Sequence, residues 1–264
     1  MSRVTVSAGR RCLLKWKLLL TTLPVVAAII LIRQALRRGF GFEGSVEFTD
    51  VAVVLSGGVF LLGFMLSGTM SDYKEAEKLP GEIVSGLETV EEVMVHVAVV
   101  KGDDPAVHRR ALLSLLDAID QWLRKCIGEQ QMHEALNRLT STFPAIELGS
   151  HATRAFSIIG TVRRALIRIG VISRTGFLAT GYALLQTMLT ICYLILVTAA
   201  FKTQLGEFVV VSFVALIYTY MYNLIKDIDD PFDYGAAGAN GAAEVELYPL
   251  SEYRARLAAR IEVP

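Results

Sequence analysis

The sequence predicts an all-α membrane protein with four transmembrane helices and a helical domain between the second and the third. The 264 residues are 53% hydrophobic and have a mean hydropathy of +0.47, which is too apolar for a soluble domain of this size. Four apolar stretches, residues 18–36, 51–70, 177–201 and 208–225, are long enough to cross a hydrocarbon core of about 30 Å as helices. The charged, amphipathic segments gather between the second and the third stretch, in residues 71–174.

The first predicted span, residues 18–36, follows a basic leader, residues 1–17, that contains no acidic residue. This combination is also compatible with a cleavable signal peptide. We favour a spanning helix, because the apolar run continues through Ile29–Ile32 without the small residues of a signal-peptide cleavage site, and because a second hydrophobic helix follows. An organellar address in the leader is the remaining interpretation. Pro24 predicts a kink, which membrane helices tolerate.

The second span, residues 51–70, is uncharged but rich in small residues, which favours close packing against other helices. Ser56, Phe60 and Phe64 stand at i, i+4 and i+8 and therefore share one stripe of a helix. One interpretation is that the phenylalanines face lipid or a partner helix. The other is that several copies arranged around an axis place them in a narrow neck, where an apolar constriction blocks ions by staying dry. The glycines that would let the neck helices pack are Gly57, Gly58 and Gly63.

The block 71–174 has the periodicity of amphipathic helices rather than of strands. Its first apolar stripe consists of Ile83, Val84, Leu87, Val90, Met94 and Val97. Its second consists of Leu112, Leu115, Leu116, Ile119, Trp122, Leu123, Cys126 and Ile127. We therefore expect an all-helical domain on one side of the membrane.

The third and fourth spans are separated only by KTQLGE and are expected to form an antiparallel hairpin. Gln186, Thr187 and Thr190 in the third span either line a wet path or, as is commoner, form hydrogen bonds between helices. Lysines and arginines are concentrated on the side that holds both termini and residues 71–174, so the positive-inside rule places that side in the cytoplasm or its equivalent.

The C-terminal segment, residues 226–264, begins with an acidic cluster, Asp227, Asp229, Asp230 and Asp233. Carboxylate oxygens suit calcium, although the spacing is not that of an EF-hand loop. The alternative is that these side chains are solvated or paired with arginines of the 71–174 block. A small-residue linker, residues 234–243, and a short terminal helix, residues 251–261, follow.

Several classes of function have no support. The 26 basic and 26 acidic residues balance, so nucleic-acid binding is not indicated. The four histidines and three cysteines lack the spacing of zinc ligands. GFGFEG at 39–44 matches a dinucleotide fingerprint only formally, because no strand–helix context surrounds it. An enzyme is not expected, because the spans offer no Asp, Glu, His or Lys for acid–base or nucleophilic work.

Two stretches resemble the bestrophins, four-span proteins that assemble as pentamers around an axial ion pore. The first is FLLGF at 60–64 followed by SDYKEAEKLPGEIV at 71–84, where the similar positions are Ser71, Tyr73, Lys78, Leu79 and Gly81. The second follows the fourth span and comprises Asp229, Asp230, Pro231 and Phe232, and then Tyr248, Pro249 and Leu250. The order of spans and helical block also agrees.

The resemblance implies a bestrophin-like homopentameric ion channel, for anions such as chloride, with the 51–70 helix as its neck. Its partners would be further copies of itself, membrane lipid and inorganic ions. No cofactor is expected with the exception of calcium at the aspartates. The alternative function is a non-conducting four-span protein whose 71–174 domain acts as a scaffold or sensor.

Overall fold

The computed structural model describes residues 8–143, 149–175, 179–235, 238–239 and 243–262. The chain divides into two compact units, which we call the membrane unit (residues 1–71 and 177–229) and the helical unit (residues 72–176 and 230–264). The predicted all-α class is confirmed, since helices form almost all of the described chain. Parts of the predicted leader, of the start of the third span and of the 234–243 linker lie outside the described residues.

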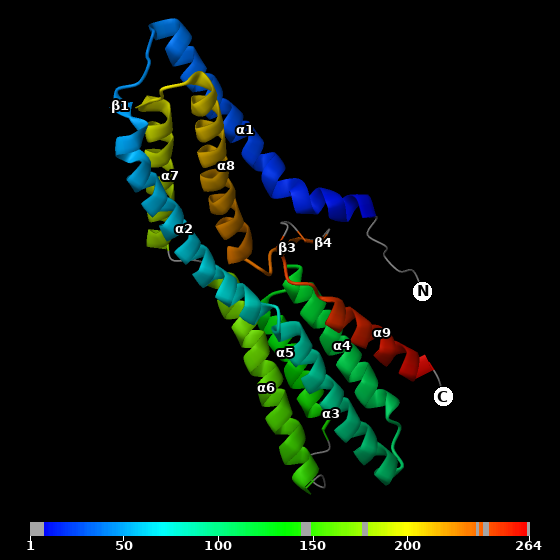
Figure 1. Cartoon of the computed structure of the whole chain (residues 1–264). Helices are drawn as coiled ribbons and strands as arrows, with labels where there is room; N and C mark the ends of the chain where they lie inside the picture. The colour runs from blue at the N-terminus through cyan, green and yellow to red at the C-terminus, as the bar shows by residue number, and fades with distance from the viewer. Residues whose placement is uncertain (1–7, 144–148, 176–178, 236–237, 240–242, 263–264) are drawn as a thin grey trace. The chain divides into compact units, whose positions relative to one another are not determined.

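The membrane unit is built from four helices, each long and apolar enough to cross a membrane. They are α1 (Ala8–Phe40), α2 (Phe48–Ala76, whose last turn belongs to the helical unit), α7 (Ala179–Thr198) and α8 (Gln204–Asp229). Helix α1 packs on α7 and α8, and α7 packs on α8 (Figure 1). The chain is therefore an integral membrane protein. Most ends of the four helices lie within a few residues of the ends of the spans predicted by composition.

Helix α1 continues through Pro24, as expected for a membrane helix whose neighbours supply polar partners. Thr22, fully buried two residues before the proline, donates a hydrogen bond to the Leu18 carbonyl at 2.7 Å. Its hydroxyl also accepts one from the Asn223 amide of α8 at 3.3 Å. This polar contact ties α1 to α8 inside an otherwise apolar core.

The connections of the membrane unit meet in a short parallel pair of strands, β1 (Val46–Glu47) and β2 (Ala199–Ala200). Gly44, just before β1, has a φ of 108°, and a Cβ atom there would lie 2.6 Å from the backbone nitrogen of Ala200. Only glycine fits this conformation and this backbone approach. The last glycine of GFGFEG thus has a structural reason, and the sequence does not lie in a strand–turn–helix unit.

The helical unit contains α3 (Leu79–Lys101), α4 (Ala106–Leu123), α5 (Glu129–Ser141), α6 (Gly149–Arg174) and α9 (Tyr248–Glu262). Helix α3 packs on α6 and α9, and α4 packs on α5 and α9. The residue pairs of β3 (Tyr234–Gly235) and β4 (Gly238–Ala239) are antiparallel. The core is formed by the predicted stripe of α3 up to Met94 together with residues of the other helices, among them Leu112, Leu115, Ile119, Met132, Leu136, Leu166 and Tyr253.

The prediction that the second stripe is buried is wrong at one residue, Cys126, which is exposed. Helix α4 ends at Leu123, and Lys125 adopts a left-handed conformation with a φ of 60°. The helical periodicity on which the prediction depended therefore stops before Cys126. The other thiol whose exposure is described, Cys192 of α7, is buried and free.

The C-terminal helix is held on the helical unit by Glu91, a carboxylate that is only 3% exposed. Arg109 of α4 donates to Glu91 Oε1 at 3.0 Å, and Arg260 of α9 donates to Oε2 at 2.7 Å. The buried Tyr253 hydroxyl also donates to Oε2 at 3.3 Å, and both burial and the Glu91 charge raise the pKa of Tyr253. Glu91 therefore links α3, α4 and α9.

We expect Glu91→Leu to destabilise the helical unit by about 2 kcal/mol, less than the loss of a fully buried pair because both arginines are partly exposed. Thermal unfolding of the purified protein and limited proteolysis of α9 measure the effect. Glu92→Leu is the matched control, because Glu92 is exposed and has no ion pair within the described chain. Equal melting temperatures for the two variants would contradict the role of Glu91.

Candidate functional site

Helix α2 has two different faces. Its buried face consists of Leu55, Gly58, Leu62, Met65 and Thr69, and packs into the core of the membrane unit. The opposite face is uncovered, and Phe60 and Phe64 on it are 77% and 72% exposed. The spacing of both stripes is three to four residues, as for any helix buried on one side only.

The uncovered face is a mixture of large apolar and small residues. Five exposed residues follow one another along it at helical spacing: Val53, Ser56, Phe60, Phe64 and Ser67. The Ser56 hydroxyl donates to the Ala52 carbonyl of its own helix at 2.9 Å. The three predicted pore-lining residues, Ser56, Phe60 and Phe64, thus lie together on a surface that the rest of the described chain leaves open.

The three predicted packing glycines have different surroundings. Gly58 lies against Tyr218 of α8 and Met188 of α7, and the Tyr218 hydroxyl donates to the Leu55 carbonyl. By contrast, a Cβ atom at Gly57 or Gly63 would have no heavy atom of the described residues within 4 Å. This count leaves out the two adjacent residues and the backbone of the same helix. Gly58 is therefore a packing position within the protomer, whereas Gly57 and Gly63 leave space beside the phenylalanine stripe.

We expect Gly58→Ala to destabilise the membrane unit by about 1–3 kcal/mol, because the added methyl group overlaps the phenolic oxygen of Tyr218. Gly68→Ala is the matched control on the same helix, since nothing lies within 4 Å of its Cβ position, and a gain of up to about 1 kcal/mol is expected there. Melting temperatures in detergent compare the two. If Gly58→Ala is as stable as Gly68→Ala, the close contact of α2 with Tyr218 is wrong.

The polar residues of α7 make contacts inside the protomer. Gln186 donates an amide hydrogen bond to Tyr222 of α8 at 3.3 Å. Thr187 and Thr190 each donate to a carbonyl one turn earlier in their own helix, at 2.8 Å. Gln186 therefore forms a hydrogen bond between helices, as expected, whereas the Thr187 and Thr190 hydroxyls bond within α7 itself.

The four aspartates near the end of α8 are divided between the units. Asp227 and Asp229 belong to the membrane unit, where Tyr182 donates to Asp229 at 2.7 Å. Asp230 and Asp233 belong to the helical unit, where Lys125 donates to Asp233 at 2.6 Å. No group of three or more His, Cys, Asp or Glu side chains suited to a metal is formed by the described residues. Calcium binding stays a prediction from the sequence.

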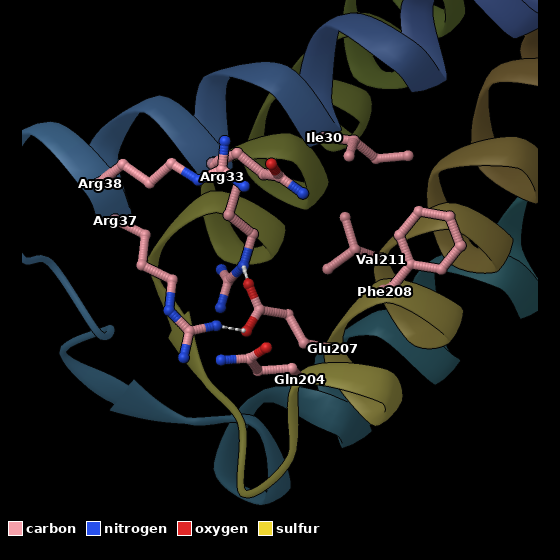
Figure 2. Close-up of a pocket in the computed structure, with 9 residues that line it drawn as sticks. Ile30, Arg33, Arg37, Arg38, Gln204, Glu207, Phe208 and Val211 are labelled. Atoms are coloured by element: carbon pink, nitrogen blue, oxygen red, sulfur yellow. Dashed lines mark hydrogen bonds and ion pairs between the residues drawn. The ribbon is translucent and has the colours of Figure 1, made fainter.

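The sequence did not reveal a polar cluster formed by Arg33, Arg37 and Glu207. This cluster connects the ends of α1 and α7 with the start of α8. Arg33 is only 7% exposed and donates to Glu207 Oε1 at 2.6 Å (Figure 2). It also donates to the carbonyls that end α7 and begin β2, those of Leu196 at 2.6 Å, Val197 at 2.9 Å and Ala199 at 2.5 Å. A cation at the C-terminal end of a helix is stabilised by unpaired carbonyls and by the helix dipole.

Arg37 completes this cluster by donating to Glu207 Oε2 at 2.9 Å, and the Arg33 guanidinium also lies 4.9 Å from the Phe201 ring. From the sequence, Glu207 is expected in the connection KTQLGE, and neither Arg33 nor Arg37 is assigned a role. The available signal was that Arg33 falls inside the predicted span 18–36, where a charge requires a partner.

No protein-family model matches the sequence, and no curated protein matches it. Solved structures, however, match along almost the whole chain. A crystal structure of a bacterial bestrophin homologue from Klebsiella pneumoniae with a mutation has a TM-score of 0.71 and 15% identity, covering 94% of this chain and 100% of that one. A second mutant of the Klebsiella homologue has a TM-score of 0.67 and 16% identity, with coverage of 93% and 99%.

A third structure, described only as a membrane protein with a mutation, has a TM-score of 0.70 and 15% identity, with coverage of 92% and 98%. The shared layout includes the spans and the helical block between the second and the third. The resemblance inferred from two short motifs is thus confirmed at the level of the fold: the chain has the fold of the bacterial bestrophin homologues, at about 15% sequence identity.

Proposed function

We propose that the protein is a homopentameric ion channel for anions, with α2 as its neck. The observation that carries the proposal is the uncovered stripe of α2, on which Phe60 and Phe64 are largely exposed although the opposite face of the helix is buried. The bestrophin-like fold supports it, because the sequence resemblance implies pentamers around an axial pore.

The composition of the stripe favours a water-filled or helix-packed surrounding over lipid. A face that contacts only acyl chains needs no small or polar residues, whereas Ser56 and Ser67 flank the two phenylalanines here. Gly57 and Gly63 lie beside the same stripe and leave room for a neighbouring helix. Five copies around an axis then bring the phenylalanines into two rings, which form a hydrophobic barrier to ions.

Selectivity for anions is proposed from the family resemblance. Rings of Asp or Glu side chains favour cations in pores, and rings of Lys or Arg favour anions. Residues 51–70 contain no charged side chain, so the neck itself offers a ring of neither kind. Ions would cross the neck after partial dehydration, without a titratable group in residues 51–70.

The oligomeric state tests the assembly. We expect native mass spectrometry of the protein in mild detergent to give a mass of five 28.9 kDa chains. A monomer or dimer under conditions in which the protein remains folded would contradict the channel. An intact pentamer that carries no current would favour the non-conducting scaffold instead.

A further inference from the structure

The ends of α1 and α8 enclose a pocket that the channel function does not use. Its volume is about 360 Å³, and its walls come from α1 on one side and from the first two turns of α8 on the other (Figure 2). Because the pocket lies near the end of one membrane span and the start of another, we expect it at the membrane surface. It belongs entirely to the membrane unit.

The charge of the pocket is positive. Three arginines, Arg33, Arg37 and Arg38, line it with a single carboxylate, Glu207. Arg33 and Arg37 both pair with Glu207, so the carboxylate is already shared between two guanidinium groups. Arg38 is exposed and forms no ion pair with any described residue. An anion could therefore bind Arg38, and the outward edge of Arg37, without competing with Arg33.

The pocket is also graded from polar to apolar along the helices. On α1, Ile30 lies eight residues before Arg38, about 12 Å at 1.5 Å per residue. On α8, Gln204 at the helix start is followed by Phe208 and Val211 farther from that end. Both helices therefore place polar groups at the ends near the connections and apolar groups deeper. Phe208 is 54% exposed, so an apolar wall is available for contact.

We propose that this pocket binds one anionic phospholipid, with the phosphate at Arg38 and Arg37 and the start of an acyl chain against Ile30 and Phe208. A free phosphate would pair with the arginines but would make no contact with the apolar wall. A neutral lipid would contact the wall but would leave the surplus positive charge unpaired. Basic pockets between transmembrane helices recognise lipid headgroups by this combination. The proposal requires only that the chain spans a membrane, and holds whether or not the protein conducts ions.

The test is lipid binding to the full-length protein in detergent, followed by native mass spectrometry. Phosphatidylglycerol, phosphatidylcholine with the same acyl chains, and inorganic phosphate are titrated separately. We expect phosphatidylglycerol to bind at least about fivefold more tightly than phosphatidylcholine, and Arg38→Gln to weaken it about fivefold, the effect of one surface arginine. Phe208→Ala should weaken phosphatidylglycerol binding too.

Lys202→Gln is the matched control, because Lys202 is an exposed cation near the start of the same helix and does not line the pocket. Equal affinities for the two lipids, or an equal loss in Lys202→Gln and Arg38→Gln, would overturn the proposal. So would inorganic phosphate that displaces phosphatidylglycerol at equal concentration, since the site would then recognise a phosphate without its lipid. Arg33 is left unchanged throughout, because its loss disturbs the helix ends themselves.

Discussion

Replacing Phe60 and Phe64 together with alanine raises the ion current through the reconstituted protein. If the two rings of phenylalanine side chains form a dry barrier, their removal widens the neck and lets water enter, which lowers the energy of an ion there. A barrier lower by about 1.4 kcal/mol corresponds to a tenfold faster passage, and we expect a change of at least that size. Planar-bilayer recording of wild type and double variant measures it.

The matched control is Phe213→Ala. Phe213 lies on α8, is 62% exposed and belongs to a membrane span, but not to the α2 stripe. It therefore tests whether any exposed phenylalanine has the same effect. Currents of the Phe60→Ala, Phe64→Ala double variant that equal those of wild type, or an equal rise in Phe213→Ala, would contradict the neck. Lipid contact would then explain the exposed stripe.

Replacing Arg33 with methionine destabilises the membrane unit more than any other single change considered for it. The Arg33 guanidinium donates to Glu207 Oε1 and to three backbone carbonyls. Methionine leaves the carbonyls without this donor, and Glu207 keeps only its pair with Arg37. Breaking a buried ion pair by removing one partner costs about 3–5 kcal/mol. Thermal or denaturant unfolding of the protein in detergent measures the loss.

Two further variants separate the geometry of Arg33 from its charge. Arg33→Lys keeps the charge but cannot reach four acceptors in different directions, so we expect it to recover only a small part of the stability. Lys202→Met, an exposed cation at the same end of the unit, should melt like wild type. If Arg33→Met melts like Lys202→Met, the Arg33 contacts do not hold the helix ends together.

The features that the sequence predicts best are local. Spans are recognisable because each contains its own run of apolar residues, and the α2 stripe is recognisable because Ser56, Phe60 and Phe64 recur with the period of one helix. The stripe of α3 is buried as predicted for the same reason. Cys126 shows the limit of this reasoning, since a periodicity does not reveal where the helix ends.

The features that the sequence could not predict depend on partners far away in the chain. Arg33 binds carbonyls more than 160 residues later, and backbone acceptors leave no trace in a pattern of residue types. Gly58 was predicted as a packing residue of the neck, but its neighbour in the protomer is Tyr218 of α8. Glu91 similarly shares its charge with Arg260, which is 169 residues away.

The most direct test of the proposed channel is single-channel recording in a planar bilayer with different concentrations of potassium chloride on the two sides. The pentameric state of the protein is verified beforehand, so that an absence of current cannot be attributed to unassembled protein. We expect unitary currents whose reversal potential shifts toward the equilibrium potential of chloride. A verified pentamer without currents above those of the empty bilayer would contradict the channel, and a reversal potential at the potassium equilibrium would contradict its anion selectivity.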